Sequence, residues 1–99
     1  MAYQQGGAGA DTLQGGNASD YLYGAGGADR LYGGFNRDHL SGDDGADLLL
    51  GEFQDDWLFG GAGNDVLDAG SGDDLLDGGL GADLLRGGTG DDRFLLGDA

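Results

Sequence analysis

Large apolar residues recur along this chain at a fixed spacing of nine. An Asp precedes each of them by two residues, and the apolar series is Leu13, Leu22, Leu31, Leu40, Leu49, Leu58, Leu67, Leu76, Leu85 and Phe94. In each nine-residue unit the first six residues are rich in Gly and polar residues, and the last three alternate around the apolar one. Alternation is typical of a half-buried strand, and Gly-rich segments are typical of turns. Ten units run from Gly6 to Leu95 without an insertion or deletion.

A period held this strictly indicates a solenoid, in which each unit packs on its neighbours. Six turn residues and three strand residues make half a coil, so two units complete a coil of 18 residues. We predict an all-β parallel solenoid with two short-stranded parallel sheets and about five coils, with ten buried Leu or Phe side chains between the sheets. Gly at the first, second and fourth places of each unit is expected to supply the positive φ angles of the turns.

The predicted organisation has three parts: an N-terminal lead-in at 1–5, the array of ten nonapeptides at 6–95 and a C-terminal tail at 96–99. Within the lead-in, Tyr3 is the residue expected to pack on the first coil. The loops alternate between the two sides of the solenoid. We call the loops of the odd-numbered units (6–11, 24–29, 42–47, 60–65 and 78–83) the odd side, and those of the even-numbered units the even side.

Charge then narrows the class of partner. The formal net charge is −15, and the 99 residues contain no Cys and four residues that are Lys or Arg. So few basic residues and so large a negative charge argue against nucleic acid as a partner, because its phosphates are bound by Lys and Arg. The lack of Cys excludes disulfides and thiolate metal sites. We expect no membrane span and find no signal-peptide pattern at MAYQQ. Carboxylate and carbonyl oxygens suit a hard cation, calcium before magnesium or zinc.

The units resemble the glycine-rich nonapeptide GGxGxDxUx of repeats-in-toxin (RTX) proteins, and the resemblance covers residues 6–95. It implies a right-handed parallel β-roll with Ca²⁺ held between loops two units apart. In that family one loop offers the carbonyls of its second and fourth places and its Asp. The next loop on the same side offers the carbonyls of its first and third places and its own Asp. One ion here would lie between Gly61, Gly63 and Asp65 and Gly78, Leu80 and Asp83.

Carried over residue by residue, the resemblance implies two sets of metal ligands. The carboxylate ligands are Asp11, Asp20, Asp29, Asp38, Asp47, Asp56, Asp65, Asp74, Asp83 and Asp92. The backbone carbonyl ligands are those of Gly7, Gly9, Gly24, Ala25, Gly26, Gly27, Gly42, Asp43, Asp44, Gly45, Gly60, Gly61, Ala62, Gly63, Gly70, Gly72, Gly78, Leu80, Gly87 and Thr89.

The two sides differ at the fourth place of the loop. Every odd-side loop has Gly there, whereas three even-side loops have Ala18, Asn36 and Gln54. A residue other than Gly is strained at positive φ. Five loops a side leave four gaps a side, so at most eight ions fit, and we expect five well-formed Ca²⁺ sites: four on the odd side and one between Asp74 and Asp92. Arg37 could replace part of an ion's charge on the even side.

Outward positions of the even strands carry aromatic side chains, among them Tyr21, Tyr23, Trp57 and Phe59, beside the single His, His39. Two interpretations stay open: cross-strand packing on a solvated sheet, or a contact surface for a partner, a second copy or a sugar. We expect His39 to be a surface residue. Paired acids such as Asp55–Asp56 follow the loop period, so we predict no active site and no enzyme activity.

The leading hypothesis is a non-enzymatic calcium-binding module whose folding is driven by Ca²⁺ and whose parent protein is secreted to the extracellular space. Fifteen net negative charges and the ordering of many Gly residues predict a metal-free chain that is unfolded. The alternatives are a binding or assembly module that uses the aromatic sheet, or an accessory fragment of a secreted enzyme. Self-association through the open solenoid ends or the aromatic sheet is a further expectation.

Overall fold

The computed structural model describes residues 3–17 and 19–95, which form eleven strands of three residues each and, within that range, no helix. Ala18, the tail at 96–99 and the first two residues of the lead-in lie outside the described residues. The strands are β1 (Tyr3–Gln5), β2 (Thr12–Gln14), β3 (Tyr21–Tyr23), β4 (Arg30–Tyr32), β5 (His39–Ser41), β6 (Leu48–Leu50), β7 (Trp57–Phe59), β8 (Val66–Asp68), β9 (Leu75–Asp77), β10 (Leu84–Arg86) and β11 (Arg93–Leu95).

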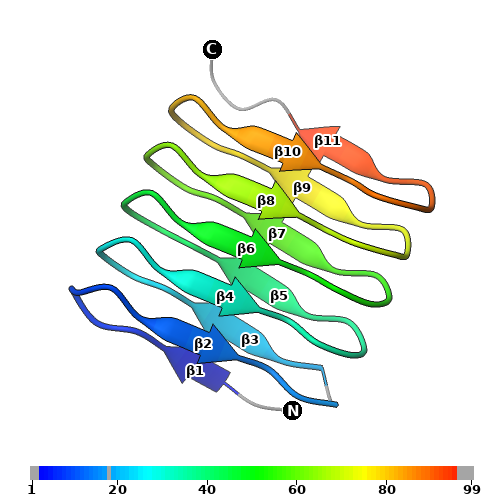
Figure 1. Ribbon diagram of the computed structural model, residues 1–99, viewed down its shortest axis with the longest axis horizontal. Coiled ribbons are helices and arrows are strands. Elements are labelled where there is room, and N and C mark those ends of the chain that lie inside the picture. The colour runs from blue at the N-terminus through cyan, green and yellow to red at the C-terminus, as the bar shows by residue number, and fades with distance from the viewer. Residues whose placement is uncertain (1–2, 18, 96–99) are drawn as a thin grey trace.

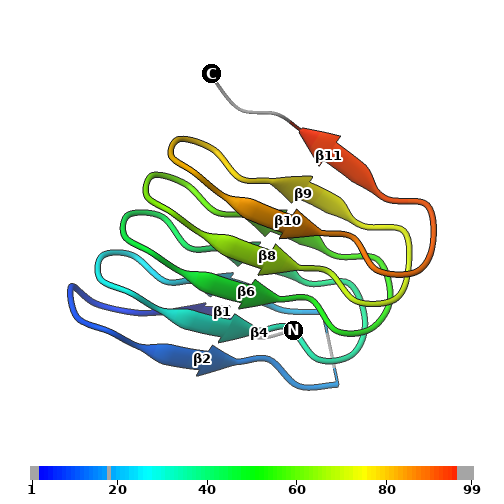
Figure 2. The same cartoon turned by 45° about the horizontal axis from the view of Figure 1, so that its top comes forward.

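Successive strands alternate between two parallel sheets. Sheet A has the order β1-β3-β5-β7-β9-β11, and sheet B has the order β10-β8-β6-β4-β2. Each residue pairs with the one 18 positions further on, as Leu40 does with Leu58 and Leu49 with Leu67. Figures 1 and 2 show the coils stacked from the N-terminal to the C-terminal end, with a loop on each side. The predicted parallel β-solenoid with a coil of 18 residues is therefore confirmed. No helix in the described part of the chain is long and apolar enough to cross a bilayer.

The core is a single ladder of Leu side chains between the two sheets. Seven Leu side chains have no exposed surface, and they are Leu22, Leu31, Leu40, Leu49, Leu58, Leu67 and Leu76. Leu13 and Leu85 are partly buried against this ladder, but Phe94 is 45% exposed. The expectation of ten buried side chains was therefore wrong at the ends, because β2, β10 and β11 each have a neighbouring strand on one side only among the described residues.

The lead-in contributes a strand that lacks the repeat motif. Tyr3–Gln5 pairs with β3 in parallel register, which places Gln4 beside Leu22. The ring of Tyr3 lies 5.3 Å from that of Tyr23, so Tyr3 does pack on the first coil as expected. Sheet A consequently has six strands and sheet B five.

The glycines serve two different purposes. At the second and fourth places the described loops from residue 25 onward adopt positive φ, for example Gly61 at 86° and Gly63 at 110°. The first-place glycines do not, so the expectation that they supply positive φ was wrong. They instead leave room for the loop's own carboxylate: a Cβ on Gly60 would stand 2.7 Å from Oδ2 of Asp65.

Gly63→Ala tests the close approach of the loops. The new Cβ would stand 2.4 Å from the carbonyl oxygen of Gly45, at a φ of 110° that Ala rarely adopts. We expect a loss of at least about 2 kcal/mol in the free energy of unfolding, measured by urea denaturation at saturating calcium. Gly7→Ala is the control, since its Cβ would meet nothing within 4 Å. Equal effects of the two changes would contradict the packing described here.

Candidate metal centre

The last residue of each loop is an Asp, which the fold buries in the seven loops from Asp20 to Asp74. It stands immediately before a three-residue strand, so its side chain turns back into the loop rather than out to solvent. The exposed fractions of Asp29, Asp47, Asp56 and Asp65 lie between 0% and 3%. Buried carboxylates are costly unless they are neutralised or bonded to a charge-compensating group. Their surroundings therefore decide what this structure can bind.

The carboxylates form a ladder along each side of the solenoid. The backbone N–H of Asp47 donates to Oδ1 of Asp65 at 2.8 Å, and the N–H of Asp65 donates to Oδ1 of Asp83 at 2.7 Å. On the even side the N–H of Asp56 donates to Oδ1 of Asp74 at 2.6 Å. Each Asp thus reaches across the gap toward the preceding loop on its own side. This bond fixes the carboxylate and directs its Oδ1 toward the preceding loop.

The second carboxylate oxygen is different, because it is buried and has no hydrogen-bond partner. This holds for Oδ2 of six described residues: Asp29, Asp38, Asp47, Asp56, Asp65 and Asp74. A backbone carbonyl of the next loop comes close to the same point. The position that a Cβ of Gly60 would take is 2.7 Å from both Asp65 Oδ2 and the carbonyl oxygen of Gly78. The unpartnered carboxylate oxygen of Asp65 and a carbonyl oxygen of the next loop thus lie near the same position of the loop.

Further carbonyl oxygens enter each gap. Between loops 42–47 and 60–65, the carbonyl oxygens of Asp43 and Gly45 lie 2.2 and 2.4 Å from the positions that Cβ atoms on Gly61 and Gly63 would take. From the opposite loop, Ala62 turns its carbonyl oxygen back to accept a bond from the Gly45 N–H at 3.1 Å. In this gap the structure places the second- and fourth-place carbonyl oxygens of one loop against the next loop, whose third-place carbonyl oxygen points back toward them.

The second-place carbonyls also hold the loops to each other. The N–H of Leu80 donates to the carbonyl oxygen of Gly61 at 3.1 Å. In the same way the N–H of Thr89 donates to the carbonyl oxygen of Gly70 at 3.1 Å. Since a carbonyl oxygen has two lone pairs, one bond of this kind leaves the oxygen able to accept another partner.

Burial perturbs these carboxylates strongly. It raises the pKa of Asp56 to about 9, those of Asp38, Asp65 and Asp74 to about 7, and that of Asp47 to about 6. Backbone N–H bonds oppose this rise, and neighbouring carboxylates on the same ladder add to it. The ionised ladder is therefore unfavourable without a positive charge in the gaps.

The donor set suits a hard divalent cation. Each gap offers two carboxylates and several carbonyl oxygens, the ligands that calcium prefers. No group of three or more His, Cys, Asp or Glu side chains gathers among the residues that the structure describes. A site in the gaps must therefore draw most of its oxygens from the backbone, and the orphaned Oδ2 atoms are the observation that fits such an ion.

A comparison with protein families decides the assignment. The family described as RTX calcium-binding nonapeptide repeat (4 copies) matches residues 5–40, 41–76 and 68–98, which is nearly the whole chain. The chain belongs to the RTX calcium-binding nonapeptide repeat family. No curated protein matches it.

From residue 25 onward, the RTX loops of both sides adopt positive φ at the same two places despite their different sequences. On the even side, Asn36 and Gln54 adopt φ of 70° and 69° at the fourth place, where the odd side has Gly. The second place of the loop also holds residues other than Gly, on both sides of the solenoid. Ala25 and Asp43 on the odd side and Glu52 on the even side also adopt positive φ there. The absence of Gly at the second place of those loops was the signal that would have found them.

The remaining predicted residues lie outside the ladder. Arg37 has a side chain that is 80% exposed and 3.8 Å from the carboxylate of Asp55, so it lies at the rim of its loop. His39 is half-buried, with its ring 5.5 Å from those of both Tyr21 and Trp57.

The pKa values of the RTX carboxylates predict how pH acts on the metal-free chain. The ordinary Asp pKa is 3.8, whereas burial raises the folded values to between about 6 and about 9. In that window the folded chain holds protons that the unfolded chain has released, so stability falls as pH rises. We expect β structure in the metal-free chain to increase when pH is lowered from 8.5 to 4.5, measured by far-UV circular dichroism. More β structure at pH 8.5 than at pH 4.5 would contradict this.

Proposed function

We propose that this chain is a non-enzymatic calcium-binding module whose folding is driven by Ca²⁺ held between stacked loops. The observation that carries the proposal is the set of buried Asp Oδ2 atoms that lack a hydrogen-bond partner, beside loop positions that backbone carbonyl oxygens also approach. Asp65 and Asp83, with the carbonyls of Gly61, Gly63, Gly78 and Leu80, would hold one such ion. A bound cation would neutralise the ladder, and its binding free energy would then be folding free energy.

The proposed stoichiometry is five well-formed sites and at most eight. Four lie in the odd-side gaps, and the fifth lies between Asp74 and Asp92. The other three even-side gaps border loops with Ala18, Asn36 or Gln54 at the fourth place and would bind more weakly. Eight ions would bring sixteen positive charges against a net charge of −15, which is close to neutrality.

Calcium concentration would control where such a module folds. With little Ca²⁺, as in the cytosol, the chain would stay unfolded, and at extracellular concentrations it would fold. We infer from this that the parent protein is extracellular, which the match to the RTX repeat family supports. A chain that is unfolded inside the cell is suited to export.

Isothermal titration calorimetry of the metal-free chain with CaCl₂ tests the proposal and counts the ions. We expect a coupled folding and binding transition with at least five Ca²⁺ per chain, and no such transition with MgCl₂, because Mg²⁺ loses its water reluctantly. Fewer than four ions, or an equal response to Mg²⁺, would overturn the assignment of ions to the gaps.

A further inference from the structure

Two grooves run along the solenoid where the strands leave the loops, one on each side. The even-side groove has a volume of about 420 Å³ and the odd-side groove one of about 610 Å³. Both are formed by the same places of the repeat, the last two loop places and the first strand place. The odd-side groove is lined at its fifth places by Ala10, Ala28 and Ala46. The fold therefore explains why a groove exists, but it does not explain the lining of the even-side one.

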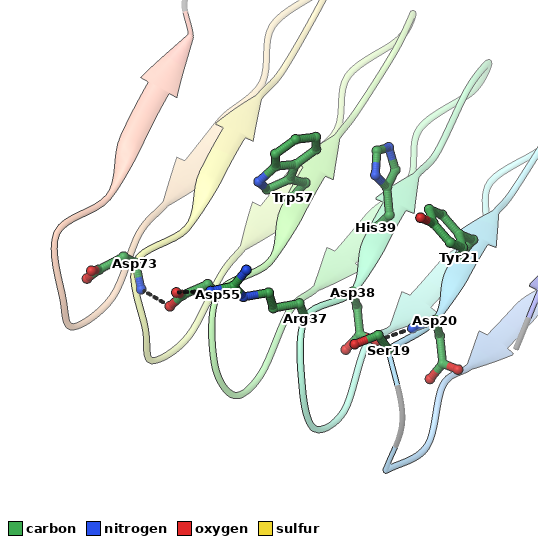
Figure 3. A pocket seen from close by; sticks show the side chains of 9 residues that line it. All are labelled: Ser19, Asp20, Tyr21, Arg37, Asp38, His39, Asp55, Trp57 and Asp73. Carbon is green, nitrogen blue, oxygen red and sulfur yellow. Dashed lines mark hydrogen bonds and ion pairs between the residues drawn. The ribbon is translucent and has the colours of Figure 1, made fainter. Parts of the chain in front are cut away.

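Aromatic rings form the wall of the even-side groove. Tyr21, His39 and Trp57 project in a row from β3, β5 and β7, as Figure 3 shows. Neighbouring ring centroids are 5.5 Å apart, and the indole of Trp57 is 52% exposed. The corresponding places of the odd-side groove hold no aromatic residue but Thr12, Arg30, Leu48 and Val66. A row of exposed ring faces is a surface on which a flat or apolar group can stack.

Carboxylates at the fifth places form the facing rim, and the backbone holds them in position. The N–H of Asp73 donates to Oδ1 of Asp55 at 2.7 Å, and the N–H of Asp91 donates to Oδ1 of Asp73 at 2.8 Å. One oxygen of each carboxylate is used in this way; the other oxygen of Asp55 lies 3.8 Å from the guanidinium of Arg37. These acids are distinct from the buried Asp ladder, so a bound metal would leave their charge in place.

The charges of the groove favour a cation, and one cation already lies there. Apart from Asp20 and Asp38 of the metal ladder, the acids that line it are Asp55 and Asp73, and the lining holds a single Arg37. The guanidinium of Arg37 reaches 3.8 Å from Asp55, directed along the rim (Figure 3). A guanidinium can stack on an aromatic face and pair with a carboxylate at once, which an ammonium group does less well.

We propose that the even-side groove binds an arginine side chain carried by an extended segment of a partner protein, with the guanidinium stacked on Trp57 and paired with Asp55 and Asp73. The lining comes from four successive coils, from Ser19 to Asp73. Strands of neighbouring coils are ~4.8 Å apart, so the groove is about as long as four residues of extended chain. This length favours a peptide segment over a small free cation. The inference concerns the folded module and adds a partner to the calcium function.

Trp57 is the single Trp of the chain, so its fluorescence reports directly on the groove. The probe is an acetylated Gly-Ser-Arg-Ser-Gly amide titrated into the calcium-saturated chain, and its control is the same peptide with citrulline, which has the shape of arginine without its charge. We expect a saturable change in Trp57 emission with the arginine peptide and at least tenfold weaker binding of the citrulline peptide. Equal binding of the two peptides would overturn the proposal.

Variants then locate the contact. Asp55→Asn together with Asp73→Asn is expected to weaken binding about tenfold, because a charge-assisted bond is lost at each position. Arg37→Gln is expected to tighten binding severalfold, because it frees the carboxylate of Asp55. Asp68→Asn, which removes an acid from the outer face of sheet B, is the charge-matched control and should leave binding unchanged. Far-UV circular dichroism checks that each variant folds with calcium.

Two further outcomes would overturn the proposal. If Asp68→Asn weakens binding as much as the groove variants do, the attraction is to the net charge of the chain and not to the groove. If free acetylargininamide binds as tightly as the peptide, or a neutral methyl glycoside changes Trp57 emission more than either, then the ligand is not an extended arginine segment.

Discussion

Replacing Asp65 with Asn is expected to raise the calcium concentration for half-maximal folding by at least tenfold. Asp65 faces two gaps, since its Oδ1 accepts the N–H of Asp47 and its own N–H donates to Oδ1 of Asp83. The substitution would therefore remove a charged ligand from two proposed ions at once. Charged hydrogen-bonding interactions contribute about 1.5–3 kcal/mol each, so the combined loss is on the order of 3–6 kcal/mol. The measurement is a calcium titration followed by far-UV circular dichroism.

Asp68→Asn is the matched control for this substitution. Asp68 lies three residues further along in β8, on the outer face of sheet B, and carries the same charge. Its replacement should change the calcium midpoint by less than about twofold, because a partly solvated charge contributes little. If Asp65→Asn and Asp68→Asn shift the midpoint equally, the buried ladder has no special role.

Leu58→Ala should be the most damaging core substitution, because Leu58 lies in the middle of the ladder with no exposed surface. The cavity that it leaves lies between two coils of short strands that have no other apolar layer to close over it. We expect a loss of about 2–5 kcal/mol in the free energy of unfolding at saturating calcium, measured by urea denaturation.

Leu84→Ala controls for the loss of the same side-chain atoms. Leu84 is 56% exposed on β10, and its replacement is expected to change stability by less than about 0.5 kcal/mol. A loss of similar size for the two variants would mean that the Leu ladder is not the core.

The spacing of Leu and Asp was sufficient to predict the coil, the two sheets and the register, because a period of nine can place Leu40 on Leu58 in only one way. The same spacing could not predict β1, where Gln4 takes the place of Leu and no Asp precedes it. Nor could it predict the exposure of Phe94, which depends on what covers β11 rather than on the repeat.

The repeat was sufficient to predict which loops lie next to each other on one side of the solenoid. The carbonyl oxygens of Asp43, Gly45 and Ala62, for example, lie between two such loops. The conformational cost of each loop was less accessible from sequence. In one even-side loop, not only Gln54 at the fourth place but also Glu52 at the second place adopts a positive φ, 77° for Glu52. Gly permits a positive φ, but stacking on the neighbouring coils imposes it on other residues as well.

Calcium-driven folding is tested most directly by far-UV circular dichroism of the full chain at neutral pH, first with excess chelator and then with millimolar CaCl₂. We predict a spectrum of a disordered chain in chelator, a β spectrum in calcium, and full reversal when chelator is added again. A β spectrum that persists unchanged in chelator would contradict the account.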